Sequence, residues 1–271
     1  MRLISWNVAA RVKKQPQQLE ALLGKEPDLI ALQEVTAKTA RMWKTGLLEA
    51  GFKYILSSFD ISEEPEKMVG GRGRALLVAS RYPLEPLDQT GLDMPWKERL
   101  LSSLIHHPSL EFEFHNAYIP PGASHEWLKI DTFEGIYNYL AQETIIPRVL
   151  CGDFNSPKQE LTDGSTLLWG QYLAEDGSVK MSDDSRWALG EKLVICDLAE
   201  YDLPDIYRQL NGWEAEDYSF VVWRKGKIVS RRRFDHVFAS EKLNPVSCRY
   251  IHKLRENWLS DHSAIEVEFD I

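Results

Sequence analysis

The hydrophobic and polar positions of this chain follow two patterns, short apolar runs typical of buried strands and longer stretches with apolar residues at helical spacing. Residues 2–8 alternate and predict a strand, while Leu19, Leu22 and Leu23 predict a helix over 15–23. A turn at Pro27 then leads into the apolar run 29–32. The chain therefore opens with a strand–helix–strand unit, as α/β proteins do.

The same patterns extend to the C-terminus. They predict further helices over 39–50 and 126–141, a mostly helical segment over 189–211, and strands over 75–80, 100–106, 112–119, 148–151, 218–223, 233–239, 245–251 and 263–269. We expect a polar loop over 58–73 and a long surface insertion over 156–187 that holds at most one hairpin. Because no repeat or flexible linker interrupts the chain, we expect one domain over 1–271, with sheets inside and helices outside.

Composition excludes several classes of protein. The net charge of −9 and the 44% of hydrophobic residues are those of a globular protein, not of a disordered, collagen-like or coiled-coil chain. The three cysteines lie far apart, which argues against a disulfide framework and favours a reducing cytoplasm. No apolar run suits a signal peptide or a membrane span, so we expect no membrane association, and no obligate protein partner is evident.

Polar residues recur where the apolar strands end. A single acidic residue at such a place is usually a turn former, but the recurrence along one chain favours a functional site. These residues are Asn7, Glu34, Tyr118, Asp153 with Asn155, Asp235 with His236, and Asp261 with His262.

The residue types suit the hydrolysis of a phosphate ester. Glu34, Asp261 and Asp153 can supply the incomplete oxygen shell that Mg²⁺ prefers, whereas the histidines and cysteines lack the spacing of a zinc site. His262 and Asp235 can form a His–carboxylate pair. Neutral donors suited to phosphate oxygens are Asn7, Asn155 and Tyr118.

In these motifs the sequence closely resembles the endonuclease/exonuclease/phosphatase family. The matching pieces occur in the family's order over nearly the whole chain: ISWNV ending at Val8, ALQEV ending at Val35, AYIP ending at Pro120, GDFNSP ending at Pro157, RFDHV ending at Val237 and LSDHS ending at Ser263. The resemblance implies an α/β four-layer sandwich, in which two mixed β-sheets lie face to face and are flanked by helices. It also implies a site at one end of the sheets.

The resemblance further implies a role for each residue. Glu34 would be the main metal ligand, Asp261 a second carboxylate and Asn7 a support for metal and nucleophile, with Mg²⁺ as cofactor and Mn²⁺ as a substitute. Asp153 would orient or deprotonate the attacking water, and His262, oriented by Asp235, would contact the phosphate together with Asn155 and Tyr118. The residues leave open whether Asp153 or His262 is the base.

Within the family, the branch of exonuclease III and the abasic-site endonucleases is most similar. Tyr118 in an AYxPxG context and Pro157 after GDFNS resemble that branch. Inositol polyphosphate phosphatases usually carry an aromatic residue and an arginine after GDxN, where this chain has Ser156 and Pro157. Arg232 stands where some relatives carry an aromatic residue of the abasic pocket, so a preference for abasic sites stays open.

A basic stretch adjoins Asp235. It contains Arg224, Lys225, Lys227, Arg231, Arg232 and Arg233 without an acidic residue. We expect a hairpin that follows the phosphates of DNA, with the last three arginines as contacts, although a solvated turn is the alternative. Phe220, Trp223 and Trp258 could stack on bases, but a core position is favoured for each.

The expected function is that of a divalent-metal-dependent phosphodiesterase that hydrolyses DNA, as a 3′-exonuclease or abasic-site endonuclease in DNA repair. The alternative enzyme is a phosphodiesterase or phosphatase for a small phosphorylated metabolite or a lipid headgroup. A module that only binds is less favoured because every catalytic position is occupied.

Overall fold

Two β-sheets form the centre of the computed structural model, which describes residues 1–182 and 184–271. The first sheet has six strands in the order β16 (Pro245–Ile251), β17 (Ala264–Phe269), β1 (Arg2–Asn7), β2 (Leu29–Val35), β4 (Ala75–Ser80) and β3 (Tyr54–Ser57). The second has five strands in the order β15 (Asp235–Ala239), β8 (Arg148–Asp153), β7 (Glu111–Tyr118), β6 (Leu100–His106) and β5 (Leu84–Pro86). Both sheets are mixed, because β1 pairs with β2 and β7 pairs with β8 in parallel while the other neighbours are antiparallel.

The two sheets pack face to face. Ala31 and Val78 of the first sheet belong to the same buried apolar cluster as Phe114 and Cys151 of the second. Alternate residues of these strands point to the opposite face, where helices cover them. The core therefore lies in three apolar layers, one between the sheets and one on each outer face.

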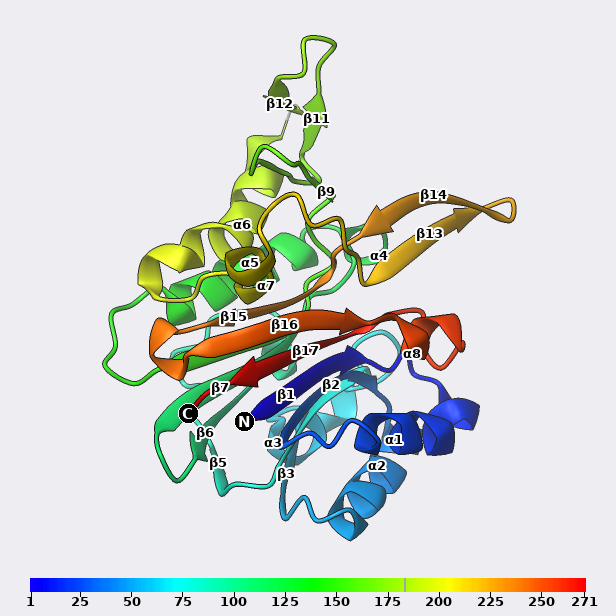
Figure 1. Cartoon of the computed structure of the whole chain (residues 1–271), viewed down its shortest axis with the longest axis vertical. Coiled ribbons are helices and arrows are strands. Elements are labelled where there is room, and N and C mark those ends of the chain that lie inside the picture. Colours follow the sequence, from blue (N-terminus) through cyan, green and yellow to red (C-terminus); the bar gives the residue numbers. More distant parts are fainter. Residues whose placement is uncertain (183) are drawn as a thin grey trace.

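Helices form the outer layers (Figure 1). The first sheet is covered by α1 (Gln15–Leu23), which has Pro16 in its first turn, and by α2 (Ala37–Glu49). The second is covered by α5 (Leu128–Leu140) and α6 (Ser185–Ile195). This arrangement confirms the predicted α/β sandwich of two face-to-face mixed sheets flanked by helices.

The remaining elements are short. Helical turns are α3 (Ser58–Ile61), α4 (Gly122–His125), α7 (Ile206–Asn211), α8 (His252–Glu256) and the 3-10 helices Val12–Lys14, Pro65–Lys67, Lys97–Arg99, Asp197–Tyr201 and Glu241–Leu243. Three two-stranded ribbons pair β9 (Gln159–Glu160) with β10 (Thr166–Leu167), β11 (Gln171–Leu173) with β12 (Val179–Met181), and β13 (Phe220–Arg224) with β14 (Lys227–Arg232).

One predicted segment differs from the structure and another is confirmed with an interruption. The insertion over 156–187 contains two ribbons, β9–β10 and β11–β12, as well as the first turn of α6, where at most one hairpin was expected; its residue 183 lies outside the described residues. The segment 189–211 is mostly helical, as expected, since it contains the end of α6, the 3-10 helix Asp197–Tyr201 and α7. The helices are interrupted where Asp202 takes a left-handed conformation (φ 59°) and Pro204 follows it.

Strand ends gather at one edge of the sandwich, on the right of Figure 1. There β1, β7 and β8 end at Asn7, Tyr118 and Asp153. Asp235 begins β15 and pairs in register with Asp153, because β15 runs antiparallel to β8. The polar residues that the sequence places at strand ends thus reach the same place. Among the described residues, none of the helices is long and apolar enough to cross a membrane.

Candidate active site

Gly152 allows the two central strands of the second sheet to lie close together at the site. Its φ is +140°, and a Cβ atom there would lie 1.9 Å from the carbonyl oxygen of Ala117 on β7. A side chain is therefore excluded at this position. The glycine of the GDFN motif thus lets β8 deliver the buried carboxylate of Asp153 beside Tyr118, its register partner.

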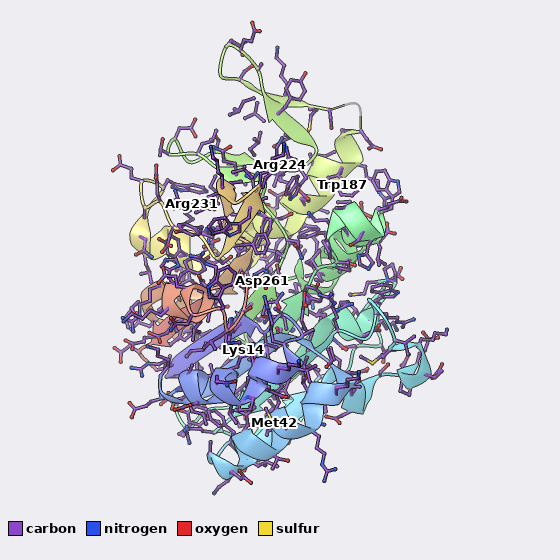
Figure 2. The ribbon with its side chains drawn as sticks, turned by 90° about the vertical axis from the view of Figure 1, so that its right-hand side faces the viewer. Lys14, Met42, Trp187, Arg224, Arg231 and Asp261 are labelled. Carbon is purple, nitrogen blue, oxygen red and sulfur yellow. The ribbon has the colours of Figure 1, made fainter. Side chains whose placement is uncertain are left out.

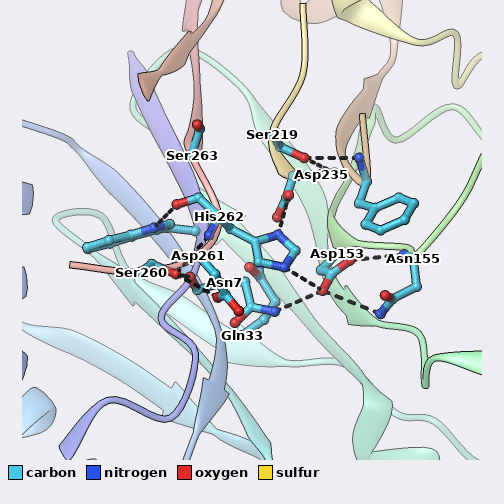
Figure 3. Close-up of polar contacts among 12 residues, drawn as sticks. Asn7, Gln33, Asp153, Asn155, Ser219, Asp235, Ser260, Asp261, His262 and Ser263 are labelled. Atoms are coloured by element: carbon cyan, nitrogen blue, oxygen red, sulfur yellow. Dashed lines mark hydrogen bonds and ion pairs between the residues drawn. The ribbon is translucent and has the colours of Figure 1, made fainter. Parts of the chain in front are cut away.

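Asn7 connects the two sheets at the site. Its Nδ2 donates to Oδ2 of Asp153 at 2.8 Å (Figure 3). The same Nδ2 lies 3.4 Å from Oε1 of Glu34. The other oxygen of Asp153 accepts a hydrogen bond from the backbone N–H of Asn155 at 2.9 Å. Because β1 belongs to the first sheet and β8 to the second, the hydrogen bond from Asn7 to Asp153 spans the gap between the two sheets.

His262 lies between two carboxylates. Its Nδ1 is 2.7 Å from Oδ2 of Asp235, and its Nε2 is 3.8 Å from Oδ2 of Asp153. Burial by itself would lower the pKa of His262, but Asp235 and Asp153 outweigh it and raise the pKa above its usual value. For Asp153, burial and Asp235 raise the pKa, although His262 opposes them. The predicted His262–Asp235 pair is present in the structure.

Neighbouring groups hold this pair in place. Ser260 Oγ donates to the carbonyl oxygen of Asn7 at 2.6 Å and accepts from the backbone N–H of His262 at 3.1 Å. Ser219 Oγ accepts from the N–H of Asp235 at 3.1 Å. The ring of Phe220 lies 4.9 Å from that of His262. These contacts fix the orientation of the imidazole before any substrate binds.

Glu34 lies at an irregularity in the pairing of β2 with β4 and has a left-handed backbone (φ 59°). The hydroxyl of Tyr118 donates to its Oε1 at 2.8 Å, and Arg74 pairs with its Oε2. Burial and the charge of Glu34 raise the pKa of Tyr118 well above its usual value, so the phenol stays a hydrogen-bond donor.

Asp261, the other expected metal carboxylate, is exposed. Its Oδ1 lies 3.5 Å from Ser260 Oγ, and its charge contributes to the raised pKa of His262. Among the described residues, no direct contact joins it to Glu34.

Two groups of side chains have the chemistry of a divalent-cation site. The first is the expected set of Glu34, Asn7 and Asp261, whose side-chain oxygens are hard ligands. The second is Asp153, Asp235 and His262, which each offer an atom within 4.8 Å of the others. In the second group the raised pKa of His262 favours an imidazolium, which repels a cation. The oxygen-rich first set therefore fits a hard divalent cation better.

The predicted basic hairpin is formed by β13 and β14, and it projects beside the site. Figure 2 shows Arg224 and Arg231 on the same side of the molecule as Asp261. Arg231 is exposed and its guanidinium lies 5.1 Å from the centre of the Tyr218 ring. Arg232 is half-buried, donates to the carbonyl oxygen of Lys158 and lies over Trp169.

Arg233 does not lie on this surface. Its side chain is buried and forms ion pairs with Glu160 and Asp205, both at 2.6 Å. The expectation that Arg233 contacts DNA is corrected accordingly, since its charge is already neutralised inside the protein. Trp223 and Trp258 also differ from the prediction. A core position was favoured for each, but their side chains are 55% and 68% exposed.

Sequence reasoning missed several residues that touch the site. Arg74 pairs with Glu34 although it follows a polar loop, and Lys129 donates from α5 to the carbonyl oxygen of Asn155 at 2.9 Å. Lys129 also pairs with the buried Glu191 of α6. A single lysine in an amphipathic helix carries no signal of this role; Arg74 stands beside Arg72 in a short acid-free run that could have drawn notice.

The model of the Endonuclease/Exonuclease/phosphatase family matches residues 4–262. No curated protein sequence matches the chain significantly.

Solved structures share the fold. An AP endonuclease from Archaeoglobus fulgidus is 20% identical, with a TM-score of 0.71 and full coverage of both chains. The 3′-5′ exonuclease NExo from Neisseria meningitidis is 18% identical, with a TM-score of 0.66 and full coverage of both. TDP2 from D. rerio, complexed with single-strand DNA product, is 15% identical, with a TM-score of 0.67 over 100% of this chain and 99% of its own.

Proposed function

Because this chain belongs to the Endonuclease/Exonuclease/phosphatase family, whose members are phosphoric ester hydrolases, we propose that it is a divalent-metal-dependent phosphodiesterase that hydrolyses DNA. The observation that carries the proposal is the position of His262 between Asp235 and Asp153, close to an exposed basic hairpin. The pair of His262 and Asp235 can donate a hydrogen bond to a phosphate oxygen, and the positive charge of the hairpin suits a polyanion such as DNA.

In this proposal Glu34, Asp261 and Asn7 would hold Mg²⁺, for which Mn²⁺ could substitute. A cation held there would supply Lewis-acid stabilisation of the charge that develops on the phosphate in the transition state. Arg74, which pairs with Glu34 in the structure, is then available to a phosphate oxygen.

The side chains divide the remaining work. Asp153 accepts the proton of the attacking water, whose oxygen forms a bond to phosphorus while the ester bond to the leaving oxygen breaks. His262, held by Asp235 through Nδ1, donates from Nε2 to a phosphate oxygen. Tyr118 and Asn155 donate to the same phosphate. Asp153 suits the role of base better than His262, because the imidazole lies between two carboxylates and acts best as a donor there.

The substrate and setting are the finer part of the proposal. The exposed Arg224 and Arg231 support DNA as substrate, and the similar proteins from Archaeoglobus and Neisseria support the activity of an abasic-site endonuclease or 3′-exonuclease in DNA repair. The cysteines, which are free in the structure, support the cytoplasm as the compartment. The shared core between the sheets supports a single domain over the whole chain.

A panel of substrates tests the proposal. Purified protein is assayed on an abasic duplex, a blunt duplex and several small phosphodiesters, each with Mg²⁺, with Mn²⁺ and with EDTA. We expect metal-dependent cleavage of at least one DNA. Turnover of small phosphodiesters without any DNA cleavage would replace the proposal by the small-substrate alternative.

A further inference from the structure

Ser156 follows the residues proposed to face the phosphate and ends the loop 153–156, the catalytic loop. The whole residue is buried. Asn155, directly before it, has a left-handed backbone (φ 49°), which is uncommon for a residue other than glycine and needs support from its surroundings. Asp153 accepts a hydrogen bond from the backbone N–H of Asn155 at 2.9 Å. A shift of the backbone at Asn155 therefore moves the proposed base as well.

Lys129 of α5 holds the catalytic loop on one side. Its Nζ donates to the carbonyl oxygen of Asn155 at 2.9 Å and to Oγ of Ser156 at 2.8 Å. Its third partner is Oε1 of Glu191 on α6, at 2.5 Å. An ammonium group has three N–H donors, so each donor of Lys129 has a protein partner. Two of these partners belong to the loop.

Glu191 fixes the position of the ammonium group. It is fully buried, and it also accepts from the backbone N–H of Trp169 at 2.8 Å and from Nε1 of Trp187 at 3.2 Å. The carboxylate therefore has a fixed place, and so has the Lys129 side chain bound to it. A buried ion pair is often no more stabilising than an apolar pair of similar volume. Stability alone thus does not explain why a charged pair lies here.

His236 of β15 holds Ser156 on another side. Its Nε2 donates to the carbonyl oxygen of Ser156 at 2.9 Å, and its Nδ1 donates to Oδ2 of Asp205 at 2.9 Å. The imidazole is fully buried and packs edge to face against Phe154, with 5.6 Å between the ring centres. Ser156 is therefore held through its hydroxyl group by Lys129 and through its carbonyl group by His236.

We propose that Lys129 and His236 are positioning residues of the reaction. They hold Ser156 from two sides and so keep Asp153 and Asn155 aligned with the phosphate. Both side chains are buried, so they act through the catalytic loop and not on the substrate. This inference rests on the proposed hydrolysis of a phosphodiester at this site. A reacting group that is displaced by about 1 Å can cost roughly 100-fold in rate, because the geometry of attack is lost.

A single and a double variant separate positioning from stability. Lys129→Met removes the ammonium group and leaves Glu191 buried without its partner, so we expect both the melting temperature and kcat to fall. Lys129→Met/Glu191→Gln leaves no charge in the pair, and the amide oxygen of the glutamine can still accept from Trp169 and Trp187.

The double variant should recover its stability but not its activity. We expect its melting temperature to return close to that of the unmodified protein. Its kcat on the DNA that the unmodified protein cleaves best should stay about 10- to 100-fold low, with little change in KM, because the catalytic loop is no longer held. Recovery of kcat together with the melting temperature would reduce Lys129 to a structural residue and overturn the proposal.

Smaller changes test each side of Ser156 separately. Ser156→Ala removes only the hydroxyl group and should lower kcat by about 5-fold, in line with the loss of one hydrogen bond. His236→Phe keeps a ring against Phe154 but loses both hydrogen bonds, so kcat should fall by about 10-fold. Lys192→Met is the matched control: this lysine directly follows Glu191 but is half-exposed and pairs with Asp197, so kcat should stay the same. Normal kcat in both Ser156→Ala and His236→Phe would overturn the proposal.

Hydrogen exchange gives a readout that does not depend on turnover. The backbone N–H groups of Phe154 and Asn155 are both hydrogen-bonded, so the loop should exchange slowly in the unmodified protein. In the double variant we expect faster exchange over 153–156, measured by mass spectrometry without substrate, and unchanged exchange in β6, two strands away from β8.

The exchange result also separates this inference from the proposed function. Equal exchange of the catalytic loop in the two proteins would overturn the inference, whatever the unmodified protein cleaves. If the unmodified protein cleaves no phosphodiester but the loop exchanges faster in the double variant, the proposed function fails, and the role of Lys129 in holding the loop is retained.

Discussion

His262 and Asp235 form a 2.7 Å contact between Nδ1 and Oδ2, although 27 residues separate them along the chain. The contact leaves Nε2 facing Asp153 and the substrate side. It also explains why the imidazole keeps one orientation, since Nδ1 is already engaged.

Replacing the two groups that face the phosphate should slow the chemical step. We expect Asp153→Asn and His262→Ala each to lower kcat by about 10²–10⁴, with a much smaller change in KM, because both act in the transition state. The double variant should lose little more than the worse single one. Steady-state kinetics on a single DNA substrate gives these values, and near-normal turnover in a well-folded Asp153→Asn sample would remove the catalytic role.

Chelation should abolish activity without unfolding the protein. The three apolar layers form without help from a metal, so EDTA should leave the circular dichroism spectrum unchanged while cleavage stops. Mg²⁺ or Mn²⁺ should restore it, and Glu34→Gln should need a higher metal concentration. Full activity in EDTA would contradict the proposed metal site.

Two arginines of the basic stretch should respond in opposite ways. Arg231→Ala should weaken DNA binding and reduce its salt dependence while the melting temperature stays the same, because the side chain is exposed. Arg233→Ala should instead destabilise the fold by about 3–5 kcal/mol, because it leaves Glu160 and Asp205 buried with too little positive charge. Fluorescence anisotropy at several salt concentrations and thermal denaturation compare the two, and an equal loss of stability would refute the distinction.

The ion pairs of Arg233 should make the fold sensitive to acid. Burial alone would raise the pKa of Glu160, but Arg233 and Arg208 outweigh it and lower the pKa from its usual 4.5 to about 2. Because the folded pKa lies below the unfolded one, this carboxylate stabilises the fold above about pH 4.5, and the contribution is lost as the pH falls toward 2.

Melting temperatures measured over this pH range test the effect. Glu160→Gln should melt at a lower temperature near neutral pH but depend less on acid than the unmodified protein. Parallel pH curves for the two proteins would show that Glu160 does not contribute to the acid sensitivity.

Local patterns predicted most of the scaffold. The strands predicted over 75–80, 100–106 and 245–251 agree in both bounds with β4, β6 and β16. Their ends could be predicted because turn residues flank each apolar run. The strand predicted over 233–239 begins at Asp235 in the structure, two residues later than predicted. Arg233 and Phe234 instead form the approach to the strand.

Residues whose role depends on distant partners escaped prediction. Arg233 reads as one of six basic residues in a hairpin, yet its partners Glu160 and Asp205 lie 73 and 28 residues away. Lys129 and Glu191 are separated by 62 residues and meet only because α5 packs on α6. No local pattern shows such pairs, whereas the polar residues at strand ends are visible because each stands beside its own apolar run.

The hydrogen bond from Asn7 to Asp153 has a wider consequence, because its length depends on how the two sheets are aligned. Each residue is fixed to its own sheet, so a small slip of one sheet over the other changes the distance across the site directly. The apolar side chains between the sheets, such as Val78 and Phe114, therefore act as spacers for the reaction they never touch. Substitutions that loosen this apolar layer should therefore lower the turnover rate before they unfold the protein.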